Sequence, residues 1–402
     1  MRTLLPLLAA LIAIAAFFRD DALLTLVYFL VAAGALSVLW TRRALRNVQV
    51  GRIVDARAFV GDRVPMRIRL RNTGLLPVPW IHAQDSLPSE VIFSRPTRSA
   101  FWMGPKTTTE FAVELQPSKR GYYPLGPLTT RGGDLFGLIG DISLGSPIQY
   151  LTVFPRIVPL AALDLPSRSP LGTLRHTQPI FEDPTRPRGK REYASGDSLK
   201  RVDWKASAAT GKLQTRVYEP SVSLETVIAL DLRIDSYPEK SVYDSSELAV
   251  VAAASIANWV VAHGQPVGLL TNAIDPAAGH QEAHSLLPRK GRGHLMTLLE
   301  TLGRAQLAAG RELAQTRPLE RLLEEDGPRL SWGMTLAVIT GRTDGSISER
   351  LKPLARAGVN CVLILAAPVT TIALQALQAQ GRRYRFEVWQ AVDRSRLFEE
   401  RP

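Results

Sequence analysis

Two uncharged apolar runs, only three residues apart, open the chain and restrict how it can fold. The first covers residues 3–18 and the second residues 22–40, with Arg19-Asp20-Asp21 between them. The second run has about the 20 residues that a helix needs to cross a bilayer, and the first is slightly short. Backbone groups in lipid must bond within their own segment, which predicts helices. Residues 1–47 are therefore predicted to form a transmembrane hairpin with spans of about 3–18 and 22–40.

The charges beside the two runs predict the orientation of this hairpin. Arg2 precedes the first run, and Arg42, Arg43, Arg46 and Arg52 follow the second, whereas the turn carries one Arg against two Asp. The positive-inside bias places both ends in the cytoplasm. We expect a protein of the bacterial inner (cytoplasmic) membrane, with both termini and the soluble domains cytoplasmic. A cleaved signal peptide is the competing interpretation of the first run, although the second run follows at once.

The charge balance narrows the partners to be expected. The chain has 49 Lys and Arg against 37 Asp and Glu, a net charge of +12. This balance suits nucleic acid, an anionic lipid bilayer or an acidic protein. No nucleic acid is expected, because the sequence has no zinc-finger spacing and no RNA-binding aromatic signature. The only cysteine, Cys361, cannot form an internal disulfide, which fits a reducing compartment.

Alternation of apolar and polar residues predicts a β-rich domain over residues 48–158. In the run 64–71, Val, Met, Ile and Leu alternate with Pro or Arg, as in a half-buried strand. Residues 111–115 predict another strand, and frequent Gly and Pro indicate turns. We predict a small β-sandwich-like domain here. Residues 159–223 are predicted to be a connector that carries a signature motif.

Compact apolar runs alternate with helical spacing over residues 224–402. Strands are predicted at 226–230, 267–270, 336–339, 361–365 and 386–389, and helices at 248–261, 294–313, 319–325, 347–357 and 371–380. Continuous apolar strands separated by helices indicate a mostly parallel sheet with both faces covered. The fold class expected is an α/β doubly wound domain.

The connector ends in a run of mixed charges at residues 188–207. The residues that define this run are Arg191, Tyr193, Gly196, Asp197, Asp203, Trp204, Lys205 and Ser207. Alternating signs around Gly196 indicate ion pairing at a turn, and Trp204 is expected to insert into a core. We predict a brace between the two domains, with a docking or phosphate-contacting surface as the alternative. A catalytic site is not indicated, because no nucleophile with an adjacent His base is visible.

These residues resemble the signature of the domain of unknown function 58 family, in which an R-x-Y-x-x-G-D run precedes a D-W-K-x-[ST] run. The resemblance extends to the hairpin, to the α/β region and to the β region with its run 131–137, where Leu135 replaces the usual proline. It implies a membrane-anchored, von Willebrand factor A-like protein. It also implies a MoxR-type AAA+ ATPase as protein partner, and a role in the assembly or maturation of other proteins.

A von Willebrand factor A domain often binds Mg²⁺ through an aspartate-x-serine-x-serine motif and ligands from later loops. The matching run here keeps Asp231 but has Arg233 and Asp235 at the serine positions, and Thr340 and Asp344 follow the third strand. An arginine head about 4 Å from the cation would cost on the order of 4 kcal/mol per unit of metal charge. The candidate metal site of Asp231, Asp235 and Asp344 is therefore degenerate, and no cofactor is expected.

Two functions follow from these expectations. The first is a membrane-tethered cytosolic interaction or scaffold protein, not an enzyme, that docks a partner such as a MoxR-type ATPase. The alternative is a metal-dependent, hydrolase-like enzyme that uses the altered Mg²⁺-binding loop.

Overall fold

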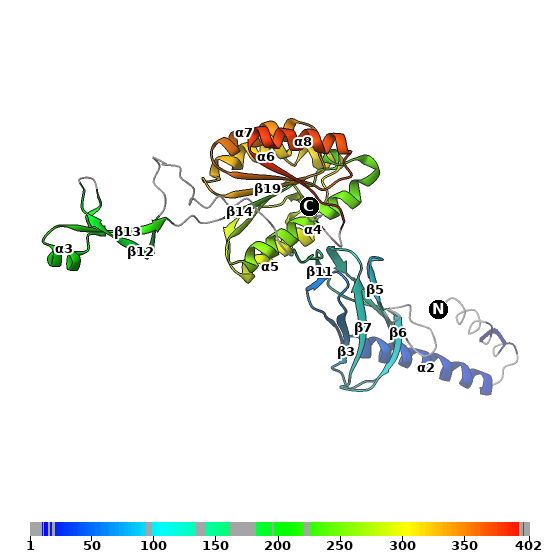
Figure 1. Ribbon diagram of the computed structural model, residues 1–402. Helices are drawn as coiled ribbons and strands as arrows, with labels where there is room; N and C mark the ends of the chain where they lie inside the picture. Colours follow the sequence, from blue (N-terminus) through cyan, green and yellow to red (C-terminus); the bar gives the residue numbers. More distant parts are fainter. Residues whose placement is uncertain are drawn as a thin grey trace. The chain divides into compact units, whose positions relative to one another are not determined.

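The computed structural model describes residues 10, 12–14, 17, 21–93, 98–133, 142–160, 182–194, 197–220, 225–393 and 397 of the 402-residue chain. The chain divides into two units (Figure 1). Unit 1 comprises Met1–Arg156, Asp275–Gly279 and Leu299–Gln306. Unit 2 comprises Ile157–Ile274, His280–Leu298 and Leu307–Pro402.

One helix, α2 (Asp21–Leu45), carries the second apolar run of the sequence. Its stretch Leu24–Leu45 is long and apolar enough to cross a bilayer and is mostly exposed in the folded chain. The helix α4 (Val242–Ala262) passes the same test of length and composition, but it is mostly buried within its own domain. Most of the predicted first span, residues 3–18, lies outside the described residues, so the hairpin stays a prediction.

The last turn of α2 is part of the core of unit 1. Ala44 and Leu45 are buried with Val48 and Ile81 in one apolar cluster. The indole of Trp40 donates a hydrogen bond to the carbonyl of Pro77 at 3.1 Å. The helix is therefore joined to the β domain by packing as well as by the chain.

Eleven described strands of unit 1 form three sheets. The first sheet has the order β1 (Val48–Ile53), β3 (Val64–Asn72), β7 (Thr108–Pro117) and β5 (Val91–Phe93). The second has the order β10 (Ile142–Ser146), β9 (Leu128–Gly133), β4 (Val78–Asp85) and β6 (Arg98–Met103). The third has the order β2 (Arg57–Phe59), β11 (Gln149–Phe154) and β8 (Gly121–Leu125).

The alternation predicted for residues 64–71 is confirmed in β3. Its apolar side chains are buried and its arginines exposed, residue by residue, because successive side chains of a strand point to opposite faces. Leu70 of the first sheet packs in one cluster with Val78 and Ile81 of the second. The two four-stranded sheets therefore share an apolar core.

Unit 2 is built on a six-stranded sheet that is parallel except at one edge. The strand order is β18 (Leu286–Arg289), β15 (Val267–Thr271), β14 (Thr226–Leu230), β19 (Thr335–Thr340), β20 (Asn360–Leu365) and β21 (Phe386–Gln390). Only β18 runs antiparallel. A short strand pair, β16 (Ile274–Asp275) and β17 (Gln281–Glu282), lies outside this sheet.

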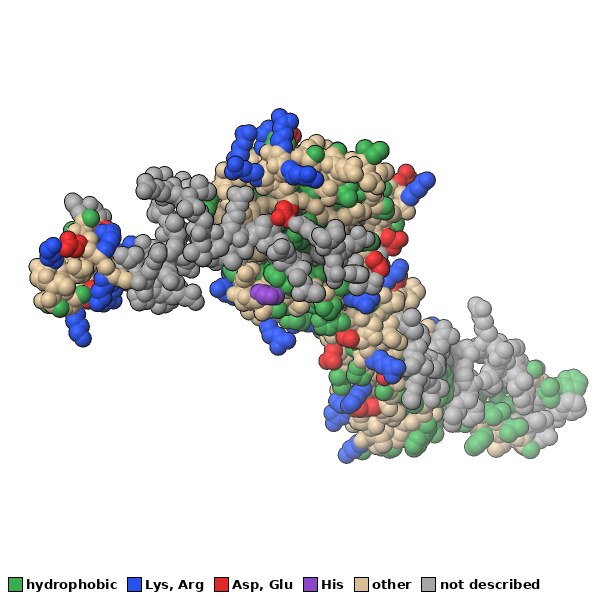
Figure 2. Space-filling view, in the orientation of Figure 1, with side chains coloured by type: hydrophobic (Ala, Val, Ile, Leu, Met, Phe, Trp, Pro, Cys, Tyr) green, Lys and Arg blue, Asp and Glu red, His purple; other side chains and the backbone are tan. Residues whose placement is uncertain are grey.

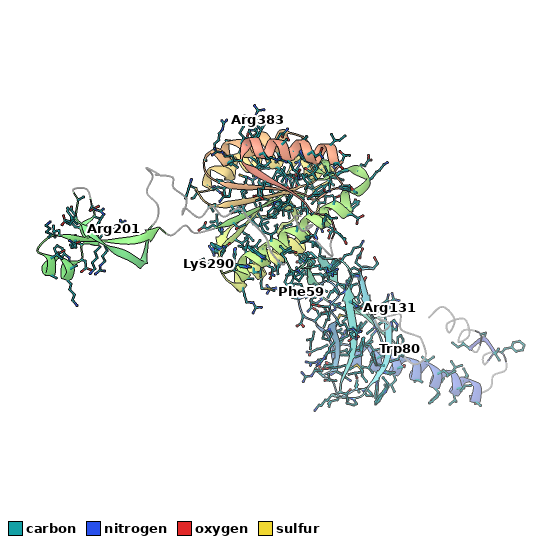
Figure 3. The ribbon with its side chains drawn as sticks, viewed as in Figure 1. Phe59, Trp80, Arg131, Arg201, Lys290 and Arg383 are labelled. Carbon is teal, nitrogen blue, oxygen red and sulfur yellow. The ribbon has the colours of Figure 1, made fainter. Side chains whose placement is uncertain are left out.

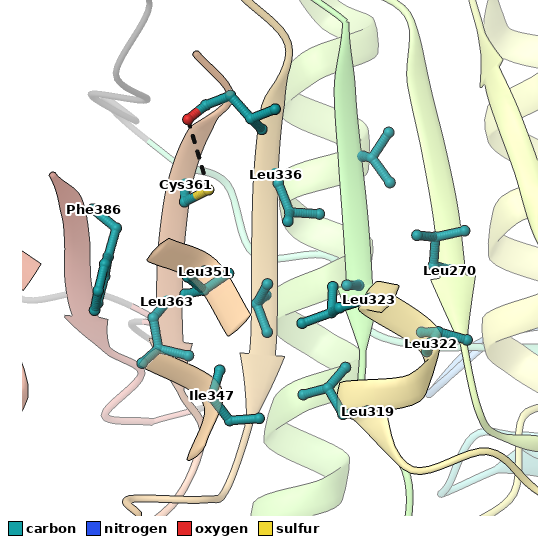
Figure 4. Packing of buried hydrophobic residues seen from close by; sticks show 14 of the residues in the cluster. Leu270, Leu319, Leu322, Leu323, Leu336, Ile347, Leu351, Cys361, Leu363 and Phe386 are labelled. Atoms are coloured by element: carbon teal, nitrogen blue, oxygen red, sulfur yellow. Dashed lines mark hydrogen bonds between the residues drawn. The ribbon is translucent and has the colours of Figure 1, made fainter. Parts of the chain in front are cut away.

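Helices cover both faces of this sheet, as the sequence predicts. On one face, α6 (Leu319–Asp326), α7 (Ser346–Arg356) and α8 (Thr371–Tyr384) bury leucines against Leu336 and Leu363 (Figure 4). On the other face, α4 packs across β14, β15 and β19. The parallel strands read as continuous apolar runs because both of their faces are buried. The von Willebrand factor A-like assignment of this sheet stays a prediction.

The helix predicted for residues 294–313 is shorter in the structure. The helix α5 (Arg292–Arg304) ends at Arg304, and a 3₁₀ turn follows at Gly310–Ala314. Between them, Ala308 pairs with Arg233 as an isolated bridge. This pairing holds the segment extended and so interrupts the helix.

Candidate functional site

The signature motif folds into a small unit, here called the hairpin module, that comprises residues 182–194 and 197–220. The strand β12 (Glu182–Glu192) pairs antiparallel with β13 (Gln214–Pro220). Between them lie a 3₁₀ turn at Leu199–Arg201 and α3 (Trp204–Thr210) (Figure 1). The predicted connector thus contains a strand pair that apolar alternation could not indicate, because β12 is almost entirely polar. Gly196 of the motif lies outside the described residues.

A carboxylate–guanidinium pair closes the first half of the motif. Both terminal nitrogens of Arg191 donate to the two oxygens of Asp197, each at 2.7 Å. The backbone N–H of Ala194 donates to the same carboxylate at 3.0 Å, and the Tyr193 hydroxyl donates to the Asp197 carbonyl at 3.2 Å. The hydrogen bonds from Arg191 lower the pKa of Asp197 below its ordinary value. The two parallel hydrogen bonds between Arg191 and Asp197 fix the orientation of this turn.

Asp203 organises the second half of the motif. It is the N-cap of α3 and accepts a hydrogen bond from the backbone N–H of Ala206 at 3.1 Å. Its other carboxylate oxygen lies 3.0 Å from Lys190 Nζ and 3.3 Å from Arg216 Nε, which come from the two strands. These bonds, that from Lys190 foremost, lower the pKa of Asp203 to about 2. One carboxylate therefore joins α3 to both strands of the hairpin.

Ser207 makes a second link between α3 and the hairpin. Its hydroxyl donates to the Asp203 carbonyl at 2.8 Å and accepts from the backbone N–H of Gln214 at 2.8 Å. A serine or threonine hydroxyl can make both bonds at once. The aspartate and hydroxyl positions of the motif thus have direct structural partners within the module.

Trp204 does not insert into a core, so that prediction is wrong. Its side chain is 67% exposed, and no residue of α3 is buried. Leu199 and Leu213 of the same module are also exposed. The module has too few apolar residues to enclose an indole. Lys205, next to Trp204, is exposed as well, so the module presents aromatic, aliphatic and basic side chains to the solvent.

A second polar centre lies at the carboxyl end of the parallel sheet of unit 2. Strands β14 and β19 are neighbours, but the chain leaves them in opposite directions across the sheet, β14 toward β15 and β19 toward β20. Ligands of open α/β sheets bind at such a topological switch point. Asp231 follows β14 directly, Thr340 ends β19 and Asn272 follows β15. The sequence pattern indicated Asp231 and Thr340 but gave no signal for Asn272.

The Asp231 carboxylate is fully buried, and each of its two oxygens accepts a hydrogen bond. It accepts a hydrogen bond from Asn272 Nδ2 and one from Thr340 Oγ1, both at 2.9 Å. The Tyr237 hydroxyl donates to the Asp231 carbonyl. Burial raises the pKa of this carboxyl above its ordinary value. A Cβ at Gly341 would collide with Tyr237, so the loop after β14 lies directly against the loop after β19.

The other two candidate metal ligands are engaged by arginines. Asp235 binds Arg233 through both oxygens at 3.1 and 2.8 Å, and Asp344 binds Arg342 through both at 3.2 and 2.7 Å. Both carboxylates are about half exposed, whereas Asp231 is buried. The remaining guanidinium nitrogens bond to backbone carbonyls of residues 313 and 316 from Arg233, and to Glu320 from Arg342.

The three predicted metal ligands therefore have separate partners. Within the described residues, no group of three or more His, Cys, Asp or Glu side chains is placed to hold a metal ion. Arg233 pairs with Asp235. The magnesium site stays a prediction that this geometry does not favour.

Comparison with known proteins gives a family match for part of the chain. Residues 189–327 match the family model described as "Protein of unknown function DUF58". This stretch runs from the hairpin module through Asp231 and Asn272 to the end of α6. The chain is also 25% identical over 347 residues to the "Uncharacterized protein YeaD" of Bacillus subtilis (strain 168), covering 84% of this chain and 79% of that protein.

Likeness to solved structures is low. The CARDB domain of the PF1109 protein from Pyrococcus furiosus aligns with a TM-score of 0.21 and 13% identity, covering 26% of this chain and 91% of that one. A cohesin module from a family 33 glycoside hydrolase of Clostridium perfringens gives a TM-score of 0.20 and 14% identity, covering 27% and 95%. The similarities that cover most of the chain or its motif are the match of residues 189–327 to the DUF58 model and the distant relative from Bacillus.

Proposed function

We propose that this protein is a membrane-tethered interaction protein whose cytosolic part docks a protein partner, a MoxR-type AAA+ ATPase, in the assembly or maturation of other proteins. The hairpin module is the docking element in this proposal. The observation that carries it is the exposure of Trp204 on a module whose own polar residues are paired with one another. Tryptophan is the residue type most enriched among the residues that dominate binding energy at protein interfaces.

The pairing inside the module supports this role. Arg191 with Asp197, and Lys190 and Arg216 with Asp203, satisfy the buried and half-buried charges locally. The module therefore keeps its shape without using Trp204, Leu199 or Leu213. Residues that a fold does not need for its own packing are available to a partner.

The tether in this proposal is α2. Its exposed apolar stretch has the length of a membrane span. Arg42 and Arg43 in the last turn of α2, and Arg46 directly after it, favour a cytoplasmic location for the soluble part. Fusing a reporter enzyme that is active only in the periplasm after Pro402 tests this topology, and activity of that reporter would contradict it.

Co-purification tests the docking. The full chain, solubilised in detergent, is mixed with a MoxR-type ATPase, in ATP, in ADP and without nucleotide. We expect Trp204→Ala to weaken capture about 30-fold, the effect of losing a dominant interface tryptophan of about 2 kcal/mol. Trp102→Ala is the matched control, because Trp102 is also 67% exposed but lies in β6 of unit 1.

The outcomes of this experiment are distinct. Capture of the wild-type chain that is lost with Trp204→Ala and kept with Trp102→Ala supports docking through the module. Equal capture of both variants would move the docking surface elsewhere. No capture in any nucleotide state would remove the ATPase from the proposal. The metal-dependent alternative gains no support from the arginine-paired carboxylates among the described residues.

A further inference from the structure

Four arginines gather where α7 and α8 end on the surface of unit 2. Figure 2 shows Lys and Arg side chains clustered over these two helices, and Figure 3 labels Arg383 among them. The four, here called the arginine surface, are Arg356 of α7 and Arg382, Arg383 and Arg385 at the end of α8. All are exposed, and within the described part of the chain none of them forms an ion pair.

An aromatic ring fixes the middle of the arginine surface. Tyr384 is half-buried, with Lys352 Nζ 4.8 Å from its ring centre and Arg383 Cζ at 5.7 Å. Lys352 comes from α7 and Arg383 from α8, so the ring ties together the basic side chains of two helices. The cation–π contact holds the Arg383 guanidinium in place and leaves its hydrogen-bond donors available, whereas Lys352 Nζ also lies 3.6 Å from Glu349 Oε2.

Arg385 adopts a backbone conformation that favours glycine. Its φ is +67°, it is the C-cap of α8, and its N–H donates to the carbonyl of Gly381. Glycine is common at such helix ends because a side chain there is strained. Strained residues often occur at functional sites.

We propose that the arginine surface binds an acidic segment of a protein partner. Guanidinium groups match carboxylates in geometry and bind them through two parallel hydrogen bonds. In the other paired arginines of unit 2, such as Arg233 and Arg342, the donors already bond to Asp, Glu or backbone oxygens. In the arginine surface, by contrast, the guanidinium groups face solvent, and none of them pairs with a carboxylate of the described residues.

A membrane surface fits this patch less well. Interfacial patches combine basic residues with protruding large apolar side chains. The large exposed apolar residue of α8 is Ile372, at the opposite end of the helix. Thirteen residues separate it from Arg385, roughly 20 Å along a helix. The arginine surface also lies far along the sequence from the hairpin module, so the two surfaces are tested by different variants.

Peptide binding tests the proposal on the full chain in detergent. The probe is a fluorescein-labelled peptide of alternating Glu and Gly, and its anisotropy is measured at low salt, with a Gln-Gly peptide as the neutral control. We expect the Glu-Gly peptide to bind and the R382Q/R383Q/R385Q variant to bind it roughly tenfold more weakly or worse, since charge-assisted bonds are lost.

The matched control removes three exposed charges elsewhere on unit 2. R289Q/K290Q/R292Q changes the net charge equally, and Figure 3 labels Lys290 in that patch. We expect it to bind the peptide like the wild type. Equal weakening of both variants, or no binding by the wild type, would overturn the proposal. Stronger competition by duplex DNA or by short-chain phosphatidylglycerol than by unlabelled peptide would overturn it in favour of nucleic acid or lipid.

Discussion

The buried ion pair in unit 1 offers a sharp test of the energetics. Arg52 and Asp85 have fully buried side chains and form a fork, with Arg52 Nε 3.0 Å from Asp85 Oδ2. The third guanidinium nitrogen donates to the carbonyl of Leu125 at 2.8 Å. Burial raises the pKa of Asp85, while the bonds and charge of Arg52 oppose that rise. The pair links β1, β4 and the end of β8.

Removing Asp85 leaves a buried guanidinium with only its bond to Leu125. Breaking one side of such a pair costs about 3–5 kcal/mol, because the remaining charge has no partner. We expect Asp85→Ala to speed amide exchange in β3 and β7 roughly 100- to 5,000-fold, since each 1.4 kcal/mol is a factor of ten. The double variant Arg52→Met/Asp85→Leu should recover most of this loss, because an apolar pair of similar volume is often neutral.

Hydrogen exchange with mass spectrometry measures both variants in the intact chain, and peptides from α7 and α8 of unit 2 serve as the internal reference. Exchange in β3 that stays within about fivefold of the wild type in Asp85→Ala, less than 1 kcal/mol, would refute the reasoning. So would a double variant as damaged as the single one. Either result would mean that solvent or a neighbouring group compensates the charge of Arg52.

Three further predictions concern unit 2. Asp203→Asn should keep the N-cap of α3 but lose the ion pairs, whereas Asp203→Ala should lose both. In the wild type, the ion pairing of Asp203 should persist above about pH 4 and weaken as the pH falls toward 2. An NMR titration of the Asp203 carboxyl group measures this change. Gly358→Ala should cost about 1–3 kcal/mol by calorimetry, because its φ is +91° and a Cβ would meet Trp332. Gly293→Ala is the control and should not destabilise the chain, because a Cβ there would meet nothing within 4 Å. Asp231→Ala should cost about 1–3 kcal/mol, and Mg²⁺ should not change the melting temperature; a Mg²⁺-dependent rise that this variant abolishes would restore the metal site.

The sequence predicted those elements whose structure depends on a few consecutive residues. The run 64–71 became β3 with its buried and exposed faces in the predicted register, and 226–230 became β14 with the same bounds. Both are set by which side chains can leave water, and that is visible in a few consecutive residues. The interrupted helix after Arg304 is different, because its cause is a bridge from Ala308 to Arg233, which lies 75 positions earlier in the sequence.

The candidate site could be predicted only in part for the same reason. Asp231 was found because it follows an apolar strand, but its partner Asn272 belongs to another strand end that lies beside it only in the folded sheet. Trp204 was expected in a core because indoles are usually buried. Burial needs a core to enter, and whether one is present depends on the surrounding fold. The error is informative, because an exposed tryptophan in a paired, polar module is the basis of the docking proposal.

The junction between α2 and unit 1 sets a geometric condition on the proposed tether. Thr41, Ala44 and Leu45 are buried in the folded chain, so a lipid-embedded segment has to end near Trp40. Residues 22–40 then supply about 28 Å of helix at 1.5 Å per residue, close to the roughly 30 Å of hydrocarbon core. Because Leu45 packs in the same cluster as Leu70 and Ile81, a helix that crosses the bilayer would hold the β domain directly at the membrane surface. A flexible linker inserted after Leu45 would break this coupling. Comparison of this variant with the wild type therefore distinguishes a helix that only anchors the β domain from one that also orients it.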